Sequence, residues 1–383
     1  MPWKETCPMD ERKRFVDDWL KREWSMGELC GYYGISRKTG YKWVERFKAG
    51  GLEALCDQSR FPRNHPNATP KEIEREVVIF RQEHPRWGPK KLAHRLRVLN
   101  PYAKWPVAST IGEIIRRHGL TAPKRRRHRT PPFKGSLCDG LNPNDVWTAD
   151  FKGWFKTGNG CRVDPFTLSD AASRYLLRCR IVDQTGGESL RGHFAAAFQE
   201  FGLPRAIRTD NGAPFASVGV GGLSRLAVWF VRLGIAPERI RPGHPEENGA
   251  HERMHLTLKQ ETASPPKESA PAQQEAFDRF RKEYNEERPH ESLGMRTPQE
   301  AYRLSERPFP NRLPDMEYPA EATVRKVRSD GCIAWRGRMI YLGMMLGGEA
   351  VGFTEIEDGN WLICFGTLKL GIYDAKTRKI RRC

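Results

Sequence analysis

Val-Trp-Thr-Ala-Asp-Phe, residues 146–151, is the stretch at which the character of the chain changes. Its residues favour a β-strand, whereas the segments before it place apolar side chains at helical spacing. Two more strand-like runs follow, at 166–168 and 175–181, and after them predicted helices alternate with single strands. Three consecutive strands followed by this alternation predict an α/β domain with a mixed sheet, which we place at residues 144–305.

The segments on either side of the α/β domain predict a multidomain chain. Residues 1–56 predict short helices joined by a tight turn, and residues 69–120 predict a second helical module. We interpret both as all-α helix-turn-helix modules. The segment 121–143 is basic and contains prolines, which predicts an extended linker. Residues 318–383 contain short strand-like runs separated by glycine and aspartate, which predict a small β-barrel.

The composition indicates a soluble protein with an anionic partner. The 383 residues carry a formal net charge of +18, and clustered lysine and arginine gain affinity for nucleic acid by releasing its counterions. Ribosomal and membrane-surface proteins are also basic, so the charge alone leaves those classes open. The nine cysteines are scattered and never form C-x-x-C, which argues against a disulfide framework or a zinc site. The sequence has no apolar run of about 18 residues and no signal peptide, so we expect a cytoplasmic protein that does not enter a membrane.

Two groups of basic residues outside the α/β domain are predicted DNA contacts. The first group lies on the predicted helix 37–48, opposite its apolar side: Arg37, Lys38, Lys42 and Arg46. The second group lies in the linker: Lys124, Arg125, Arg126, Arg127 and Arg129. We expect the basic helix to enter a major groove, and the arm to contact the backbone without reading the sequence, with a path along a minor groove as the alternative. A plain helical scaffold and a solvated arm are the alternative interpretations.

Three acidic residues are predicted to lie where an α/β sheet binds its ligands. Asp150 ends one strand, and Asp210 directly follows another, 206–209, in an Asp-Asn-Gly turn. Among the acids around the next predicted helix, 249–261, Glu252 is the one that lies clearly inside it. Cutting or joining a phosphodiester requires charge stabilisation on the attacking and leaving oxygens, which two carboxylate-bound metal ions supply. The pattern therefore predicts a site for two Mg²⁺ or Mn²⁺ ions.

Three other polar residues near these acids receive separate interpretations. His255 and Lys259 lie three and seven residues after Glu252, on the same helical face, and both are predicted contacts for DNA phosphates. Asp170 is a fourth acid, which we interpret as a structural residue that caps a turn or pairs with Arg174.

Four motifs, in this order, resemble successive signatures of insertion-sequence transposases with a retroviral-integrase-type core. They are Trp147-Thr148-Ala149-Asp150, Arg208-Thr209-Asp210-Asn211-Gly212, the run from Gly243 to Arg253, and the run from Tyr284 to Leu293. The resemblance implies an RNase H-like core in which Asp150, Asp210 and Glu252 bind the metal ions. The chain departs from the retroviral pattern in two ways. The segment between Asp210 and Glu252 is longer, with a surplus that we place at 218–222, and the His and Cys zinc module is missing.

This resemblance implies a function for the whole chain. A transposase of this kind binds the inverted ends of a mobile element, cleaves the 3′ ends and transfers them into target DNA. Two ends must be held at once, so we expect double-stranded DNA and at least one further copy of the chain as partners. Two other hypotheses stay open: a DNA-binding repressor derived from such an element, with an inactive core, and an RNase H-like nuclease that cuts without joining.

Overall fold

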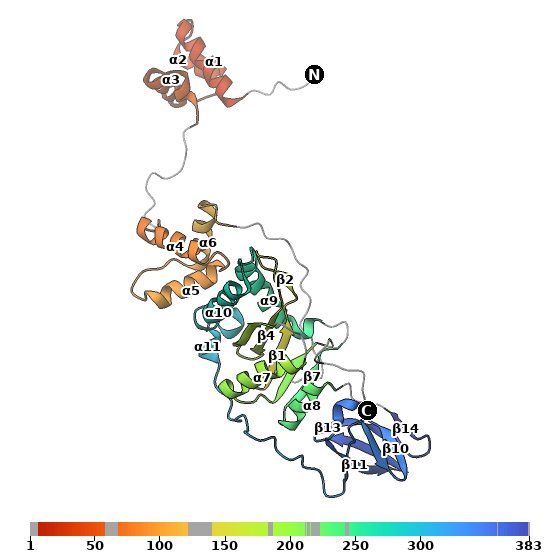
Figure 1. Ribbon diagram of the computed structural model, residues 1–383. Coiled ribbons are helices and arrows are strands. Elements are labelled where there is room, and N and C mark those ends of the chain that lie inside the picture. The colour runs from red at the N-terminus through yellow and green to blue at the C-terminus, as the bar shows by residue number, and fades with distance from the viewer. Residues whose placement is uncertain are drawn as a thin grey trace. The chain divides into compact units, whose positions relative to one another are not determined.

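The computed structural model describes residues 7–57, 68–121, 140–182, 187–210, 212, 215, 223–241, 245–357 and 359–381. The chain divides into two compact units, Met1–Pro70 and Lys71–Cys383 (Figure 1). Within the described ranges, no helix combines the length and the apolar character that crossing a membrane would require.

The first unit is a small bundle of helices. Its elements are α1 (Pro8–Lys21), α2 (Met26–Tyr32), α3 (Arg37–Gly50) and the 3-10 helix η1 (Gly51–Leu55). Ser25 and Glu28 form a capping box at the start of α2, and the hydroxyl of Ser36 accepts a hydrogen bond from the N–H of Thr39 at the start of α3. The helices share an apolar core: Phe15, Val16, Leu29, Cys30, Trp43, Val44 and Leu55. The predicted helix, turn and basic helix are confirmed.

The second unit begins with three more helices. They are α4 (Lys71–Glu83), α5 (Pro89–Leu99) and α6 (Ala108–Arg117). Pro89 occupies the first position of α5, where its missing N–H has no helical partner to lose. Arg81 donates to the main-chain oxygens of Trp87 at 2.6 Å and Leu120 at 3.0 Å, which joins the loop before α5 to the segment after α6. The second all-α segment predicted from the sequence is therefore present.

The centre of this unit is a five-stranded mixed sheet. Its strands are β1 (Val146–Phe151), β4 (Pro165–Asp170), β5 (Leu176–Ile181), β6 (Ala206–Thr209) and β7 (Ala236–Arg239), in the order β5-β4-β1-β6-β7. β1 pairs antiparallel with β4 and parallel with β6, which confirms the predicted mixed α/β core. A separate short hairpin joins β2 (Phe155–Lys156) and β3 (Arg162–Val163). Because β1 and β6 are parallel neighbours, their carboxyl ends lie at the same edge of the sheet.

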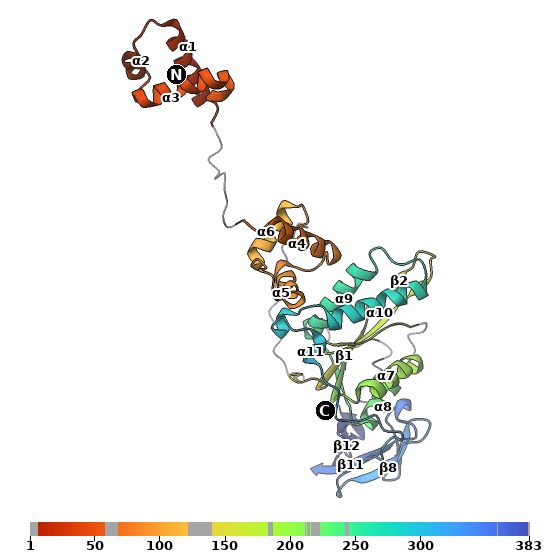
Figure 2. The same ribbon diagram turned by 90° about the vertical axis from the view of Figure 1, so that its left-hand side faces the viewer.

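Helices cover both faces of the sheet. α7 (Gly187–Phe201) and α8 (Arg225–Arg232) lie on one face, and α9 (Gly249–Thr262) and α10 (Ala270–Glu286) lie on the other (Figure 2). Since side chains alternate along a strand, Trp147 and Ala149 of β1 join the core with α7 and α8, whereas Thr148 and Asp150 face α9. The short helices flank α9 and α10: η3 (Pro245–Asn248), η4 (Glu291–Leu293) and α11 (Pro298–Ala301).

The C-terminal strands form an open sheet, so the predicted barrel is not confirmed. The sheet contains β8 (Thr323–Lys326), β11 (Ala350–Glu357), β12 (Asn360–Phe365), β13 (Leu368–Asp374) and β14 (Lys379–Arg381), in the order β14-β13-β12-β11-β8. A separate ribbon contains β9 (Cys332–Trp335) and β10 (Arg338–Tyr341), followed by η5 (Met344–Leu346). Among the described strands, β8 and β14 do not pair with each other. The reason is packing: Val228 and Val231 of α8 and Trp335 and Ile340 of the ribbon enter the apolar core of this sheet, so its burial does not require closure into a barrel.

Asp170 lies at the turn between β4 and β5, and its contribution to stability can be tested by substitution. The side chain is 1% exposed, and its carboxylate accepts hydrogen bonds from the N–H of Asn144 at 2.7 Å and from the N–H and hydroxyl of Ser173 at 2.8 and 2.6 Å. We expect Asp170→Ala to lower the free energy of unfolding by about 2–4 kcal/mol, because buried donors lose their acceptor. Urea unfolding followed by tryptophan fluorescence measures the change. Glu275→Ala, at an exposed acid of α10, should change it by less than about 0.5 kcal/mol, and equal losses in both variants would contradict the structural role.

Candidate active site

The three predicted carboxylates lie around one edge of the sheet. Asp150 is near the end of β1, Asp210 directly follows β6, and Glu252 is in the first turn of α9. Asp150 and Asp210 are half-buried, whereas Glu252 is exposed. The charges of Asp210 and Glu252 both act on the carboxyl group of Asp150. The fold therefore brings the three acids, which are far apart in the sequence, into one electrostatic neighbourhood.

The environment of Asp150 disfavours its charged form. Burial is the main cause that raises the pKa of Asp150 from 3.8 to about 7, and the charge of Asp210 is the next. The N–H of Phe151 and the charge of Lys152 lower it, and Glu252 raises it further. A divalent cation would offset the repulsion between these carboxylates, and hard ions such as Mg²⁺ are bound by carboxylate oxygens. The residues at this edge therefore fit such an ion.

Local hydrogen bonds distinguish the candidate acids from their neighbours. Oδ1 of Asp210 accepts the N–H of Gly212 at 3.1 Å, which orients the side chain in the turn after β6. Glu247, just before α9, is buried, and its carboxylate accepts both the N–H and the Nε–H of Arg241 at 2.7 Å. The carboxylate of Glu247 is thus committed to Arg241, which favours Glu252 as the third acid.

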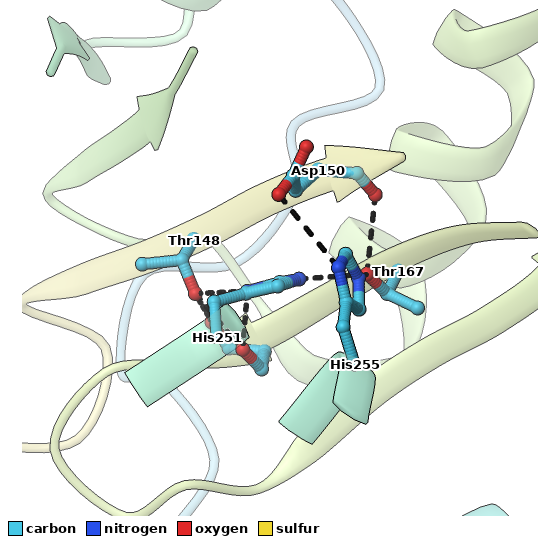
Figure 3. A network of polar contacts seen from close by, with 6 residues as sticks. Thr148, Asp150, Thr167, His251 and His255 are labelled. Carbon is cyan, nitrogen blue, oxygen red and sulfur yellow. Dashed lines mark hydrogen bonds and ion pairs between the residues drawn. The ribbon is translucent and has the colours of Figure 1, made fainter. Parts of the chain in front are cut away.

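A buried polar network joins α9 to β1 and β4 next to Asp150 (Figure 3). The hydroxyl oxygen of Thr167 lies 2.7 Å from Nε2 of His251, 2.6 Å from Nε2 of His255 and 3.1 Å from the main-chain oxygen of Asp150. Nδ1 of His251 lies 2.7 Å from the hydroxyl of Thr148. Nδ1 of His255 lies 3.8 Å from Oδ2 of Asp150. One hydroxyl group is therefore shared by two imidazole rings and the main chain of the proposed metal-binding strand.

Some of the directions in this network are fixed, and others depend on the tautomers of the two imidazole rings. A hydroxyl group has one hydrogen, and the main-chain oxygen of Asp150 can only accept, so Thr167 donates to it. Nε2 of each histidine is also hydrogen-bonded to this hydroxyl, as donor or acceptor according to the tautomer of the ring. Burial lowers the pKa of His251 to about 3 and that of His255 to about 2. Both rings are therefore neutral at physiological pH and place no positive charge beside Asp150.

Asp150 and the two histidines also form a candidate group of metal ligands. Among the described residues, Asp150, His251 and His255 have ligand atoms that all lie within 4.8 Å of one another. Asp210 and Glu252 are outside this group, so the three predicted carboxylates do not all lie within 4.8 Å of one another. Like charges oppose a closer approach when no cation lies between them. The Nε2 atoms of both histidines are bonded to Thr167, which makes the carboxylates the better ligands for a hard ion.

The predicted DNA contact of His255 is corrected by the structure. His255 is 7% exposed and its Nε2 is hydrogen-bonded to Thr167, so it is not placed to reach a phosphate on the surface. Lys259, one turn further along α9, is exposed. The five predicted contacts in the linker lie outside the described residues: Lys124, Arg125, Arg126, Arg127 and Arg129.

The basic residues of α3 differ in how accessible they are. Arg37, Lys38 and Lys42 are exposed. Arg46 is half-buried, with its guanidinium group 5.0 Å from the ring centroid of Trp43. Lys42 lies at a similar distance, 5.1 Å, from the same ring but is exposed, so the first three residues are the more accessible cations.

Sequence reasoning missed His251 and Thr167, although a signal for both is present. His251 and His255 are four residues apart on α9 and therefore share a face. Thr167 and Ser169 alternate on β4 in the same way, and the hydroxyl of Ser169 lies 3.0 Å from Nδ1 of His251. The periodicity predicts which residues share a face, but it does not predict that these two faces meet.

Protein-family comparisons match several segments of this chain. Residues 141–245 and 233–298 each match a family described as an integrase core domain. Residues 11–63 match a helix-turn-helix domain, and residues 39–115 match a homeodomain-like domain. Asp150, Asp210 and Glu252 all lie within the segments that match the integrase core.

Two curated relatives come from bacterial insertion elements. An uncharacterized 39.2 kDa protein of insertion element IS476 from Xanthomonas euvesicatoria is 28% identical over 247 residues, which cover 62% of this chain and 66% of that protein. An uncharacterized 31.7 kDa protein of insertion element IS407 from Burkholderia multivorans is 27% identical over 192 residues, which cover 50% of this chain and 67% of that protein. The chain therefore spans about two thirds of the length of these relatives.

Solved structures of viral integrases are similar at a lower level. The HTLV-2 integrase catalytic core domain in complex with magnesium is 17% identical, with a TM-score of 0.34, and the match covers 43% of this chain and 99% of that one. The simian T-cell lymphotropic virus intasome in complex with PP2A regulatory subunit B56 gamma is 16% identical, with a TM-score of 0.37, covering 76% and 97%.

The raised pKa of Asp150 predicts a pH-dependent effect of Asp150→Asn on stability. Between about pH 4 and pH 7 the carboxyl group of Asp150 binds its proton more tightly in the folded protein than in the unfolded chain. Ionisation of Asp150 therefore destabilises the fold increasingly as pH rises. An amide does not ionise, so the variant escapes this loss. In EDTA we expect Asp150→Asn to be more stable than the wild type by roughly 1–3 kcal/mol at about pH 8, with the difference shrinking toward pH 4. Urea unfolding at both pH values measures it, and a difference that does not change with pH would contradict the assigned environment.

Proposed function

We propose that this chain is a DNA transposase. It carries an integrase core domain preceded by helix-turn-helix domains, and it is similar to insertion-element proteins. In this proposal it binds the inverted ends of a mobile element, cleaves their 3′ ends and joins them to target DNA. The observation that carries the proposal is the placement of three acids around one edge of the sheet, near the end of β1, directly after β6 and in the first turn of α9.

The proposed chemistry has two similar steps. Water attacks the phosphodiester at the element's end and releases a 3′-hydroxyl, which then attacks a target phosphodiester and displaces a target 3′-hydroxyl. The attacking group comes from water or DNA, so the chain needs no Ser or Tyr nucleophile and forms no covalent intermediate. We assign Asp150, Asp210 and Glu252 the role of holding two Mg²⁺ or Mn²⁺ ions. Such ions, when bound, stabilise charge on the attacking and leaving oxygens.

The other parts of the chain receive roles in DNA binding. We propose that the modules at 1–56 and 69–120 recognise the element's ends, that 121–143 links them to the core at 144–305, and that 318–383 is a further domain. The accessible cations Arg37, Lys38 and Lys42, with Lys259 near the site, would contact DNA. At least two copies would act together, because two ends must be held at once, and DNA in the cytoplasm would be the substrate.

A basic cleft gives the C-terminal domain a proposed contact with DNA. The cleft has a volume of about 690 Å³ and is lined by five cations: Arg191, Arg225, Arg232, Lys326 and Arg328. Glu349 is the acid in its lining, and it pairs with Arg232 at 2.8 Å. Asp330 lies 3.8 Å from Nε of Arg328. The positive charges exceed the negative ones, which favours the phosphate backbone of DNA as the ligand.

The catalytic proposal is tested with a labelled duplex that carries an end of the element. We expect Asp150→Asn, Asp210→Asn and Glu252→Gln each to lower nicking and joining in Mg²⁺ or Mn²⁺ by at least about 100-fold, because each removes a metal-binding oxygen. Binding of the duplex in EDTA should stay within about threefold of the wild type. Glu275→Gln, at an exposed acid of α10, is the matched control and should keep both activities.

The same assay separates the proposal from the two rival functions. Binding by the wild type without nicking or joining would support the element-derived repressor. Nicking without joining would support the RNase H-like nuclease. A variant of Asp150 that still cleaves would refute the metal assignment.

The cleft is tested by the salt dependence of DNA binding. Each lost phosphate contact lowers the slope of log affinity against log salt by about 0.9, so the triple variant Arg225→Gln, Lys326→Gln, Arg328→Gln should lower it by about 2–3. Fluorescence anisotropy of a random-sequence duplex in EDTA measures the slope without requiring catalysis. Lys376→Gln with Lys379→Gln neutralises exposed lysines of the same domain outside the cleft lining. If the slope fell by the same amount per charge removed in this control variant, a specific role of the cleft would be contradicted.

A further inference from the structure

We propose that Thr167, His251 and His255 form a positioning unit that fixes the main chain at Asp150 relative to the helix that carries Glu252. The inference rests on the proposed function, because it concerns how two proposed metal-binding residues, Asp150 and Glu252, are held in position relative to each other. The three side chains act through Asp150 and through α9, and they do not touch the substrate.

On the strand side, the unit holds Asp150 by its main chain. Thr167 of β4 is the residue directly opposite Asp150 of β1 in the sheet, and its hydroxyl donates to the main-chain oxygen of Asp150 at 3.1 Å. This bond uses none of the lone pairs of the Asp150 carboxylate. The strand is therefore fixed while the carboxylate oxygens remain available to a cation. The N–H of Phe151 also bonds to this carboxylate, and its other lone pairs are left for the cation.

On the helix side, the unit attaches α9 at two points that flank Glu252. His251 directly precedes Glu252 and His255 lies one turn later, and Nε2 of each ring is hydrogen-bonded to the hydroxyl of Thr167. Two attachments four residues apart fix the rotation of the helix about its axis as well as its distance from the sheet. Since Glu252 lies between them, the direction in which its side chain leaves the helix is fixed as well.

The burial of the network makes each of its hydrogen bonds difficult to replace. Thr167 is 0% exposed, His251 2% and His255 7%. Water therefore cannot take the place of the Thr167 hydroxyl, and its removal leaves two buried imidazole nitrogens without their hydrogen-bond partner. The rings must then move to find new partners, and α9 moves with them. We infer that the position of Glu252 relative to Asp150, and hence metal affinity, depends on this hydroxyl.

The experiment compares two substitutions of Thr167 that differ in the hydroxyl. Thr167→Val removes it at nearly constant volume, whereas Thr167→Ser keeps it and loses a methyl group. The probe is Mn²⁺, titrated into the full chain without DNA and followed by the electron paramagnetic resonance signal of the free ion, well below the melting temperature of each variant. We expect Thr167→Val to weaken Mn²⁺ binding by about 10-fold or more and Thr167→Ser to stay within about threefold of the wild type, since residues that orient metal ligands have effects of this size.

The outcomes separate positioning from ordinary structural support. A Thr167→Val variant that melts at a lower temperature but binds Mn²⁺ like the wild type would overturn the inference. If Thr167→Val does not fold, His255→Leu gives the same test, with His255→Gln as its control because an amide can still donate to Thr167. A wild type that shows no Mn²⁺ site removable by Asp150→Asn would instead overturn the proposed function itself.

Discussion

The arrangement of the site depends on one buried hydroxyl group shared by a helix and two strands. Thr167 bonds to the main chain of Asp150 and to two histidines of α9, so a single side chain links the antiparallel half of the sheet to the helix behind it. Apolar contacts reinforce the attachment, because Met254 and Leu258 of α9 pack into a cluster with β5 and α10. The apolar cluster supplies non-directional adhesion, and the hydrogen bonds select one orientation of the helix.

The candidate site is electrostatically unfavourable in the absence of a cation. Burial and neighbouring carboxylates raise the pKa of Asp150, and the adjacent histidines are too deeply buried to become charged and relieve it. A protonated imidazole beside Asp150 would neutralise the carboxylate and compete with a metal ion. Neutral rings support the strand and leave the negative charge uncompensated, which is the condition that favours binding of a divalent cation.

Helix α8 links the core to the C-terminal sheet. Leu226, Trp229 and Phe230 pack in the core of the mixed sheet, whereas Ala227, Val228 and Val231 pack in the core of the C-terminal sheet. A helix that is apolar all round is stable only when both of its sides are covered. This shared burial and the ion pair between Arg232 and Glu349 hold α8 next to the C-terminal sheet. Residues of both line the basic cleft.

The sequence by itself determined the features that depend on neighbours within a few residues. Helix caps at Ser25 and Ser36, the alternation of strands and helices, and the acids at the ends of β1 and β6 all follow from local hydrogen bonding and periodicity. Tertiary structure alone decided that His255 faces the sheet instead of DNA, that Thr167 joins the two histidines, and that α8 packs into the core of the C-terminal sheet. Thr167 is separated from His251 and His255 by 84 and 88 residues. Contacts over that distance are fixed by which apolar faces pack together, and no local pattern along the chain contains that information.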